Sequence, residues 1–294
     1  MTVLQKPVGW LGKLDLVYGH NQGKTTLTQS QNQAPLKVQR PFYSEAEDLC
    51  QSVILHTAGG VVGGDRLSVN IHLLENAKAL ITTAAAGKIY RSNGLQARQN
   101  INIKVDPGAC LEWLPQETII FNEAIYRQDI KVDLAPGANF LGWEITRFGR
   151  TARGEKFIAG DWRSHFEVWQ EEIPLFIDRQ WLPGNEEVFH SPHGLRGQPI
   201  TGSFIWITSR DESKGERPFA PTISPEFINN VRQLWQGEGK IGASRLENGF
   251  LCRYSGNSTQ EVRDWFMSIW QLVRVSYLNR PACITNFLPR IWQI

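Results

Sequence analysis

Residues 56–65, His-Thr-Ala-Gly-Gly-Val-Val-Gly-Gly-Asp, hold the densest group of chemically useful residues in the chain. Four glycines within six positions permit positive φ angles and allow another group to approach the backbone closely. His56 begins the segment with an imidazole, and Asp65 ends it with a carboxylate. Two interpretations are open. The segment is either a tight turn capped by Asp65 beside a buried His56, or a stretch of backbone close to which another segment or an ion passes.

A second segment with chemical potential places three arginines between two glutamates: Glu144, Arg147, Arg150, Arg153 and Glu155. Two intervening glycines disfavour a continuous helix. A guanidinium group pairs with a carboxylate in a planar, bidentate geometry. The segment is therefore either an ion-pair network that holds a loop, or a set of charged groups that contacts a partner or lines a polar channel.

Residues 19–25, Gly-His-Asn-Gln-Gly-Lys-Thr, imitate a phosphate-binding loop. Only three residues separate the two glycines, where that motif has four, and the sequence that follows is polar rather than helical in pattern. We expect the tip of a hairpin here and no nucleotide site.

The composition restricts the classes of protein to which the chain can belong. The 294 residues carry a net charge of +2, which argues against nucleic acid or an anionic membrane as the main partner. Four widely spaced cysteines fit neither a zinc ribbon nor a disulfide scaffold. No apolar stretch approaches the length of a membrane span, and none at the start resembles a signal peptide. We therefore expect a cytoplasmic protein with reduced thiols.

Strands must position most of these residues, because apolar and polar residues alternate in segments 67–73, 101–105 and 130–134. A Pro-Gly turn follows two of these segments, at 107–108 and 136–137, a spacing of 29 residues, and residues 75–81 repeat the pattern loosely. Repeats of this length are typical of stacked coils. Unrelated hairpins in an ordinary sandwich would give the same pattern.

Helices are predicted only near the end of the chain. Ser224 and Pro225 form a typical helix start, and residues 258–261 form a capping box before an apolar stripe that runs to about Leu278. The stripe serves either the core or a partner groove. The fold class expected is mainly β, with stacked β-sheets of β-helix-like topology and about two C-terminal α-helices. We expect one β-rich domain over residues 1–294, with a helical part from about 224 to 280.

Six segments, in this order and spacing, together resemble the urease accessory protein family UreD, called UreH in some systems: residues 34–43, 56–65, 82–92, 114–121, 144–155 and 289–292. The resemblance implies a non-enzymatic scaffold of urease maturation that binds UreF and, through it, the GTPase UreG. It implies that this assembly, as a dimer of heterotrimers, docks on apo-urease for GTP-dependent nickel insertion. The family fold is a β-rich stack with two helices.

Nickel binds tightly to imidazole and thiolate clusters, and the sequence has no such cluster. We therefore expect Ni²⁺ in transit rather than a tightly bound cofactor. The resemblance implies that the chain has no catalytic residues. Our hypothesis is that four residues matching family motifs lie along a wet, polar passage: Asp65, Thr82, Thr83 and Glu144. The alternative is that they are loop caps and an arginine partner. We assign structural or partner-contact roles to His56, Arg147, Arg150, Arg153 and Glu155.

Two other functions remain open from the residues alone. Carbohydrate-active β-helical enzymes use Asp, Glu and Arg as working residues, and a β-sandwich module could bind a small ligand. Saccharide turnover would identify the first, and a monomer that needs no protein partner would identify the second.

Overall fold

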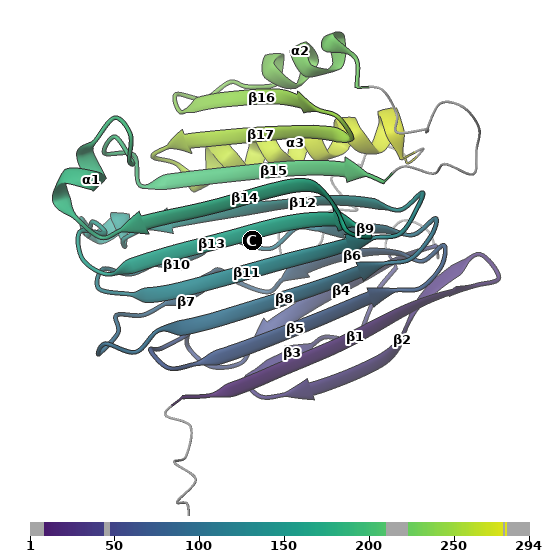
Figure 1. The fold of residues 1–294 in the computed structure, drawn as a ribbon, viewed down its shortest axis with the longest axis horizontal. Coiled ribbons are helices and arrows are strands. Elements are labelled where there is room, and N and C mark those ends of the chain that lie inside the picture. The colour runs from purple at the N-terminus through teal and green to yellow at the C-terminus, as the bar shows by residue number, and fades with distance from the viewer. Residues whose placement is uncertain (1–8, 44–47, 210–222, 279, 281–294) are drawn as a thin grey trace, which may run out of the picture.

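Seven strands form one sheet, and ten strands form a second sheet that faces it (Figure 1). The computed structural model describes residues 9–43, 48–209, 223–278 and 280. The order in the seven-stranded sheet is β14 (Ile173–Pro183), β13 (Asp161–Gln170), β11 (Ile125–Leu134), β8 (Ala97–Val105), β5 (Arg66–Leu73), β1 (Leu11–Asn21) and β2 (Lys24–Gln33). The order in the ten-stranded sheet is β16 (Lys240–Leu246), β17 (Gly249–Gly256), β15 (Ile200–Thr208), β12 (Asn139–Phe148), β9 (Cys110–Trp113), β6 (Lys78–Thr83), β4 (Leu49–His56) and β3 (Leu36–Val38), with β10 (Thr118–Ile120) paired to β12 and to β7 (Gly87–Ile89).

The central part of the chain crosses repeatedly from one sheet to the other. Strands β5, β8 and β11 lie parallel in the seven-stranded sheet, and each is followed by a strand of the ten-stranded sheet: β6, β9 and β12. The turns that join them stack on one another, since the Asn76 N–H donates to the Pro107 carbonyl at 3.0 Å and the Ala135 N–H donates to the Val105 carbonyl at 2.9 Å. These are the Pro-Gly turns of the sequence repeat. The predicted mainly β fold with β-helix-like stacking is confirmed.

Alternation along the strands builds the core between the sheets. Val69, Ile101 and Ile130 are buried there in neighbouring strands, together with Ile71 and Ile103. The residues between them point to the other face of the seven-stranded sheet, as a period of two requires. That outer face carries charged side chains such as the Arg127–Asp129 pair, which joins Nη2 to Oδ1 at 2.8 Å.

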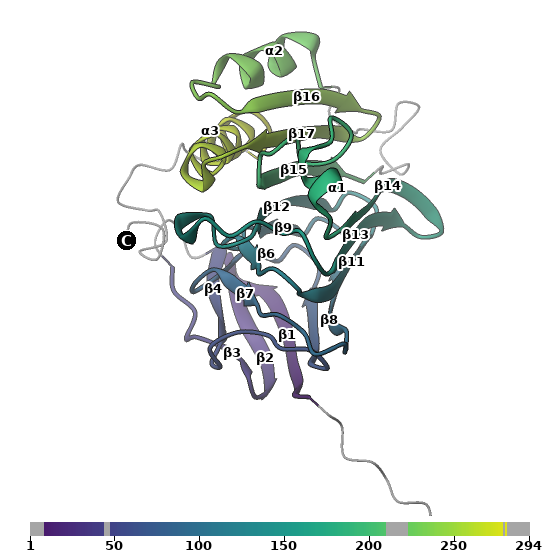
Figure 2. The same ribbon diagram turned by 90° about the vertical axis from the view of Figure 1, so that its left-hand side faces the viewer.

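Helix α3 (Thr259–Tyr277) covers the outer face of the ten-stranded sheet around β12 and β15 (Figure 2). The Ser258 hydroxyl accepts the Glu261 N–H at 3.2 Å and caps its start, as the capping box predicts. Its apolar stripe, which includes Trp265, Phe266 and Trp270, is buried against the sheet and so serves the core. Helix α2 (Pro225–Gln233) begins as predicted, with Ser224 as its cap.

A buried polar group ties α3 to the sheet beneath it. The Trp270 Nε1–H donates to Glu112 Oε2 at 2.5 Å, and Arg274 Nη1 lies 3.6 Å from the same oxygen. The Arg274 guanidinium also lies over the Trp270 ring, 4.7 Å from its centroid. Glu112 and Arg274 are both fully buried, so this ion pair is desolvated and its geometry fixes the helix against β9.

Other features complete the comparison with the sequence. Residues 19–25 form the tip of the β1–β2 hairpin, with Gln22 and Gly23 at positive φ. Between α2 and α3 the chain forms a further hairpin, β16–β17, and a short helix, α1 (Glu186–His190), precedes β15. None of the helices that the structure describes is long and apolar enough to cross a membrane. The sequence motif at residues 289–292 lies outside the described residues.

Gly202 on β15 provides a test of the packing between α3 and the sheet. A Cβ at this position would lie 2.7 Å from Val262 Cγ2 and 3.0 Å from the Phe266 ring. We predict that Gly202→Ala lowers the free energy of unfolding by about 1–3 kcal/mol, because the helix must move away. Chemical denaturation measures this loss.

The matched control is Gly242→Ala on edge strand β16, where a Cβ would meet no atom within 4 Å. This variant should be neutral or slightly stabilising, because alanine restricts the unfolded chain. Equal stabilities of the two variants would contradict the close packing of α3 on Gly202.

Candidate functional site

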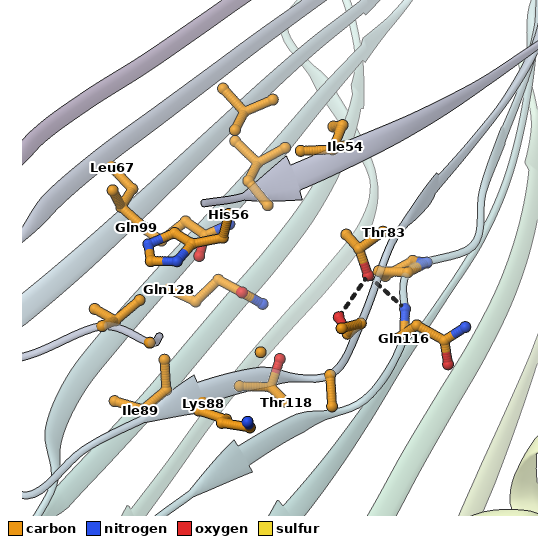
Figure 3. Close-up of a pocket in the computed structure, with 18 of the residues that line it drawn as sticks. Ile54, His56, Leu67, Thr83, Lys88, Ile89, Gln99, Gln116, Thr118 and Gln128 are labelled. Atoms are coloured by element: carbon orange, nitrogen blue, oxygen red, sulfur yellow. Dashed lines mark hydrogen bonds between the residues drawn. The ribbon is translucent and has the colours of Figure 1, made fainter. Parts of the chain in front are cut away.

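A cavity of about 310 Å³ lies between the two sheets (Figure 3). Strand β4 and the loop that follows it form one wall, and β5, β8 and β11 form the wall opposite. Most lining side chains are apolar, such as Ile54, Leu67 and Ile101. The polar ones include His56, Thr83, Gln99, Gln128 and Glu144. The sequence predicted Thr83 and Glu144 as passage residues and gave His56 a structural or partner-contact role.

The polar residues follow the register of the two sheets. One row of paired, inward-facing positions in the seven-stranded sheet consists of Gln99, Gln128, Ser164 and Gln180. A row in the ten-stranded sheet consists of Glu144, Ser203 and Arg253. We call these two rows together the polar ladder. Because each row runs across the strands, the polar ladder follows the direction in which the strands are stacked and extends beyond the cavity.

Glu144 joins the two rows of the polar ladder. Its Oε1 accepts hydrogen bonds from the Gln128 amide and, at 3.3 Å, from the Ser164 hydroxyl. The Tyr126 hydroxyl bridges Gln128 Oε1 at 3.3 Å and Gln99 Oε1 at 3.0 Å. A continuous set of hydrogen bonds therefore runs from the cavity wall at β8 to the carboxyl group on β12.

The surroundings of Glu144 favour its protonated form. Burial and, after it, the negative charge of Asp178 raise the pKa of Glu144 to about 7, although the hydrogen bonds from Ser164 and Gln128 act in the opposite direction. Asp178 is itself paired with Arg253, with 2.8 Å between Oδ2 and Nη1. Glu144 is thus a carboxyl group that exchanges its proton near neutral pH.

The two threonines of β6 lie on opposite faces of their strand. Thr83 lines the cavity, where its hydroxyl accepts the Gln116 N–H at 2.9 Å and donates to the Ala85 carbonyl at 3.3 Å (Figure 3). Thr82 is fully buried, and its hydroxyl donates to the Leu114 carbonyl at 2.6 Å. Only Thr83 is among the residues that line the cavity.

Asp65 organises the glycine-rich loop from outside the cavity. Its Oδ1 accepts the Trp10 N–H at 2.8 Å, and its Oδ2 accepts the Val62 N–H at 2.9 Å. The side chain is buried and acts as a cap of this loop. The glycines accommodate other parts of the chain, because a Cβ on Gly63 would lie 2.4 Å from Ser92 Oγ.

The arginine-rich segment forms a local ion-pair network. Arg150 Nε donates to Glu155 Oε2 at 2.8 Å, and Glu155 Oε1 accepts the Asn122 N–H at 3.1 Å. These contacts hold the loop after β12. Arg153 is exposed on a single 3-10 turn, Thr151–Arg153, and Arg147 lies three residues after Glu144, on the opposite face of β12.

Comparison with known proteins places this chain in a family. The family model described as UreD urease accessory protein matches residues 11–293. This chain belongs to the UreD family. It is 65% identical to the urease accessory protein UreD of Nostoc punctiforme, over 97% of each chain. It is also 65% identical to that of Trichormus variabilis over 100% of each chain, and 40% identical to that of Synechocystis over 90% of this chain and 95% of the relative.

UreD membership supports a role in urease maturation, together with urease and other accessory proteins, and the family name implies a non-catalytic role. Within the described ranges, no three His, Cys, Asp or Glu side chains gather as a metal-binding group. The sequence reasoning missed Gln128, Ser164 and Asp178, which surround Glu144. Their inward-facing positions follow from strand alternation, but their proximity to Glu144 follows only from the way the two sheets face each other, since the described strands that pair with β12 all belong to the ten-stranded sheet.

The raised pKa of Glu144 predicts how stability depends on pH. Between pH 4.5, the ordinary pKa of a glutamate, and about 7, the unfolded chain loses the proton that the folded chain retains. Stability should therefore fall as the pH rises through this window, by at most about 3 kcal/mol. Glu144→Gln should remove this part of the pH dependence in denaturant titrations at pH 5 and pH 8.

The control is Glu187→Gln, at an exposed glutamate of α1. It should retain the pH dependence of the unmodified chain. A Glu144→Gln variant with the same pH dependence as the unmodified chain would show that Glu144 titrates normally.

Proposed function

We propose that this chain is a non-catalytic scaffold of urease maturation that supplies part of a polar passage for Ni²⁺ on its way to apo-urease. In this proposal it works in the cytoplasm in a complex with UreF and UreG, arranged as a dimer of heterotrimers, and nickel insertion depends on GTP. Membership of the UreD family supports the maturation role. It favours this role over a carbohydrate-active enzyme or a small-ligand-binding module.

The main observation in support of the proposed passage is the position of Glu144 in the polar ladder. A cation that crosses a protein interior needs oxygen ligands in place of its water, and it must be able to leave each of them. Glu144, Gln128 and Thr83 supply such oxygens in one cavity. Scattered single donors suit transit, whereas a cluster of imidazoles or thiolates would retain nickel.

The polar ladder suggests the direction of the passage. From the cavity it continues past Glu144 and Ser164 toward Asp178 and Arg253, where Arg253 is 38% exposed. We propose that Thr83 and Glu144, which line the cavity, contact the ion. Asp65 and Thr82 do not line the cavity, and in this proposal their bonds to the backbone maintain the walls of the passage.

Urease activation tests the passage. With Glu144→Ala, we expect nickel loading of apo-urease to slow by about tenfold, which corresponds to 1.4 kcal/mol at the barrier for transit. The complex with the partner proteins should still form, and co-purification measures this separately. The exposed control Glu187→Ala should load nickel at the normal rate. Normal loading by Glu144→Ala in an intact complex would exclude this passage.

The proposal also assigns GTP to the partner GTPase. Residues 19–25 form a hairpin tip rather than a strand-to-helix phosphate loop. We therefore expect the full chain, titrated alone with GTP and Mg²⁺ in a calorimeter, to show no saturable binding. Stoichiometric binding would contradict this assignment.

A further inference from the structure

The His56 ring is held in one tautomer at the wall of the cavity. It is the last residue of β4, and its Nδ1 lies 3.1 Å from the carbonyl oxygen of Ala58. A carbonyl oxygen only accepts hydrogen bonds, so Nδ1 carries the proton and donates. In the neutral ring, Nε2 then bears a free lone pair.

This lone pair has no partner. Nε2 is buried and makes no hydrogen bond with any residue that the structure describes. The indole Nε1–H of Trp113, another residue of the cavity wall, is buried and unpaired in the same way. Buried polar atoms are normally satisfied, because an unsatisfied one costs free energy. Of these two atoms, the His56 Nε2 lone pair can bind a cation, whereas the Trp113 N–H can only donate a hydrogen bond.

The other metal-binding atoms of the cavity are oxygens, so His56 is the residue that contributes a nitrogen ligand. Thr83, Gln99, Gln128 and Glu144 offer oxygen atoms to the cavity, and oxygen donors suit Mg²⁺ and Ca²⁺ as well as other divalent ions. Imidazole nitrogen favours nickel and its neighbours in the transition series. The cysteines Cys50, Cys110 and Cys252 are not among the residues that line this cavity.

We propose that His56 is the specificity-determining residue of the cavity and that its Nε2 forms one transient bond to Ni²⁺, which separates nickel from Mg²⁺. This inference rests on the proposed nickel passage. One nitrogen ligand gives preference without retention, since a single bond breaks more readily than a chelate. The ion exchanges one water molecule for Nε2 on arrival and regains it on departure, and the ring gains and loses no proton.

The surroundings of the ring fit this role. A metal-binding histidine usually donates its other N–H to a carbonyl or carboxylate, which fixes the ring's orientation. The Ala58 carbonyl does this here. In Figure 3 the His56 ring and the Gln128 amide lie on one side of the cavity and Thr83 lies on the other. The ring would thus act on an ion that oxygen donors of the cavity also contact.

Nuclear magnetic resonance of the unmodified, ¹⁵N-histidine-labelled chain tests the first step. We expect the His56 ring to show the Nδ1–H tautomer. Addition of substoichiometric Ni²⁺, a paramagnetic ion, should broaden its signals in the presence of excess Mg²⁺. An Nε2–H tautomer, or His56 signals that stay sharp at one equivalent of Ni²⁺, would overturn the proposal.

Equilibrium dialysis of the full chain against Ni²⁺ in excess Mg²⁺ tests specificity. For His56→Gln we expect the affinity for Ni²⁺, measured in excess Mg²⁺, to fall by at least about tenfold. This is the usual scale for perturbing a metal ligand's environment. The matched control His193→Gln, at an exposed histidine, should bind as the unmodified chain does. Unchanged nickel preference in a folded His56→Gln chain would overturn the proposal.

Glu144→Ala separates this inference from the proposed function. If urease activation slows with Glu144→Ala but His56→Gln retains its nickel preference, the passage stands and the role of His56 is wrong. If neither variant changes nickel loading or nickel preference, the passage itself is wrong.

Discussion

A carboxyl group at the wall of a cavity between two β-sheets is the constraint on which the site depends. The inward face of β12 that carries Glu144 also carries the fully buried Phe140 and Phe148, four residues to either side of it. Placing a charge there costs free energy unless hydrogen bonds or a proton compensate for it. Gln128 and Ser164 supply the hydrogen bonds, and the raised pKa supplies the proton near neutrality. The two residues that stabilise this carboxyl group are thus themselves members of the polar ladder.

The sequence predicted the elements better than their pairing. Alternation identified strands, the Pro-Gly repeat identified the stacked turns, and Ser224 and Ser258 identified helix starts, because each is a local signal. Parallel pairing sets Gln128 beside Ser164, and the facing of the two sheets brings both to Glu144 on β12; no local pattern encodes either arrangement. Thr82 and Thr83 were both expected at the passage, although a period of two places adjacent side chains on opposite faces.

The two sheets are covered unequally. Helix α3 packs its aromatic stripe on the ten-stranded sheet and is held there by the fully buried Glu112–Arg274 pair. The seven-stranded sheet instead carries charged pairs such as Arg127–Asp129 on its outer face. At β12, where Glu144 lies, the cavity wall is backed by α3, whereas the opposite wall is formed by strands whose outer face carries charged side chains. A substitution on the outer face of the seven-stranded sheet is therefore closer to the cavity than a substitution on the far side of α3.

The spacing of the polar ladder has a consequence for how an ion would travel. Neighbouring strands lie about 4.8 Å apart, so successive rungs, such as Gln128 and Ser164, are one such interval apart at the backbone. First-row divalent ions sit about 2.1 Å from oxygen and nitrogen ligands, so a single ion reaches about 4.2 Å between two opposite donors. The strand spacing and the distance between two opposite ligands of one ion are therefore similar. In the proposed passage, an ion binds a donor on the next rung before it leaves the donor on the last one, so it moves by stepwise ligand exchange.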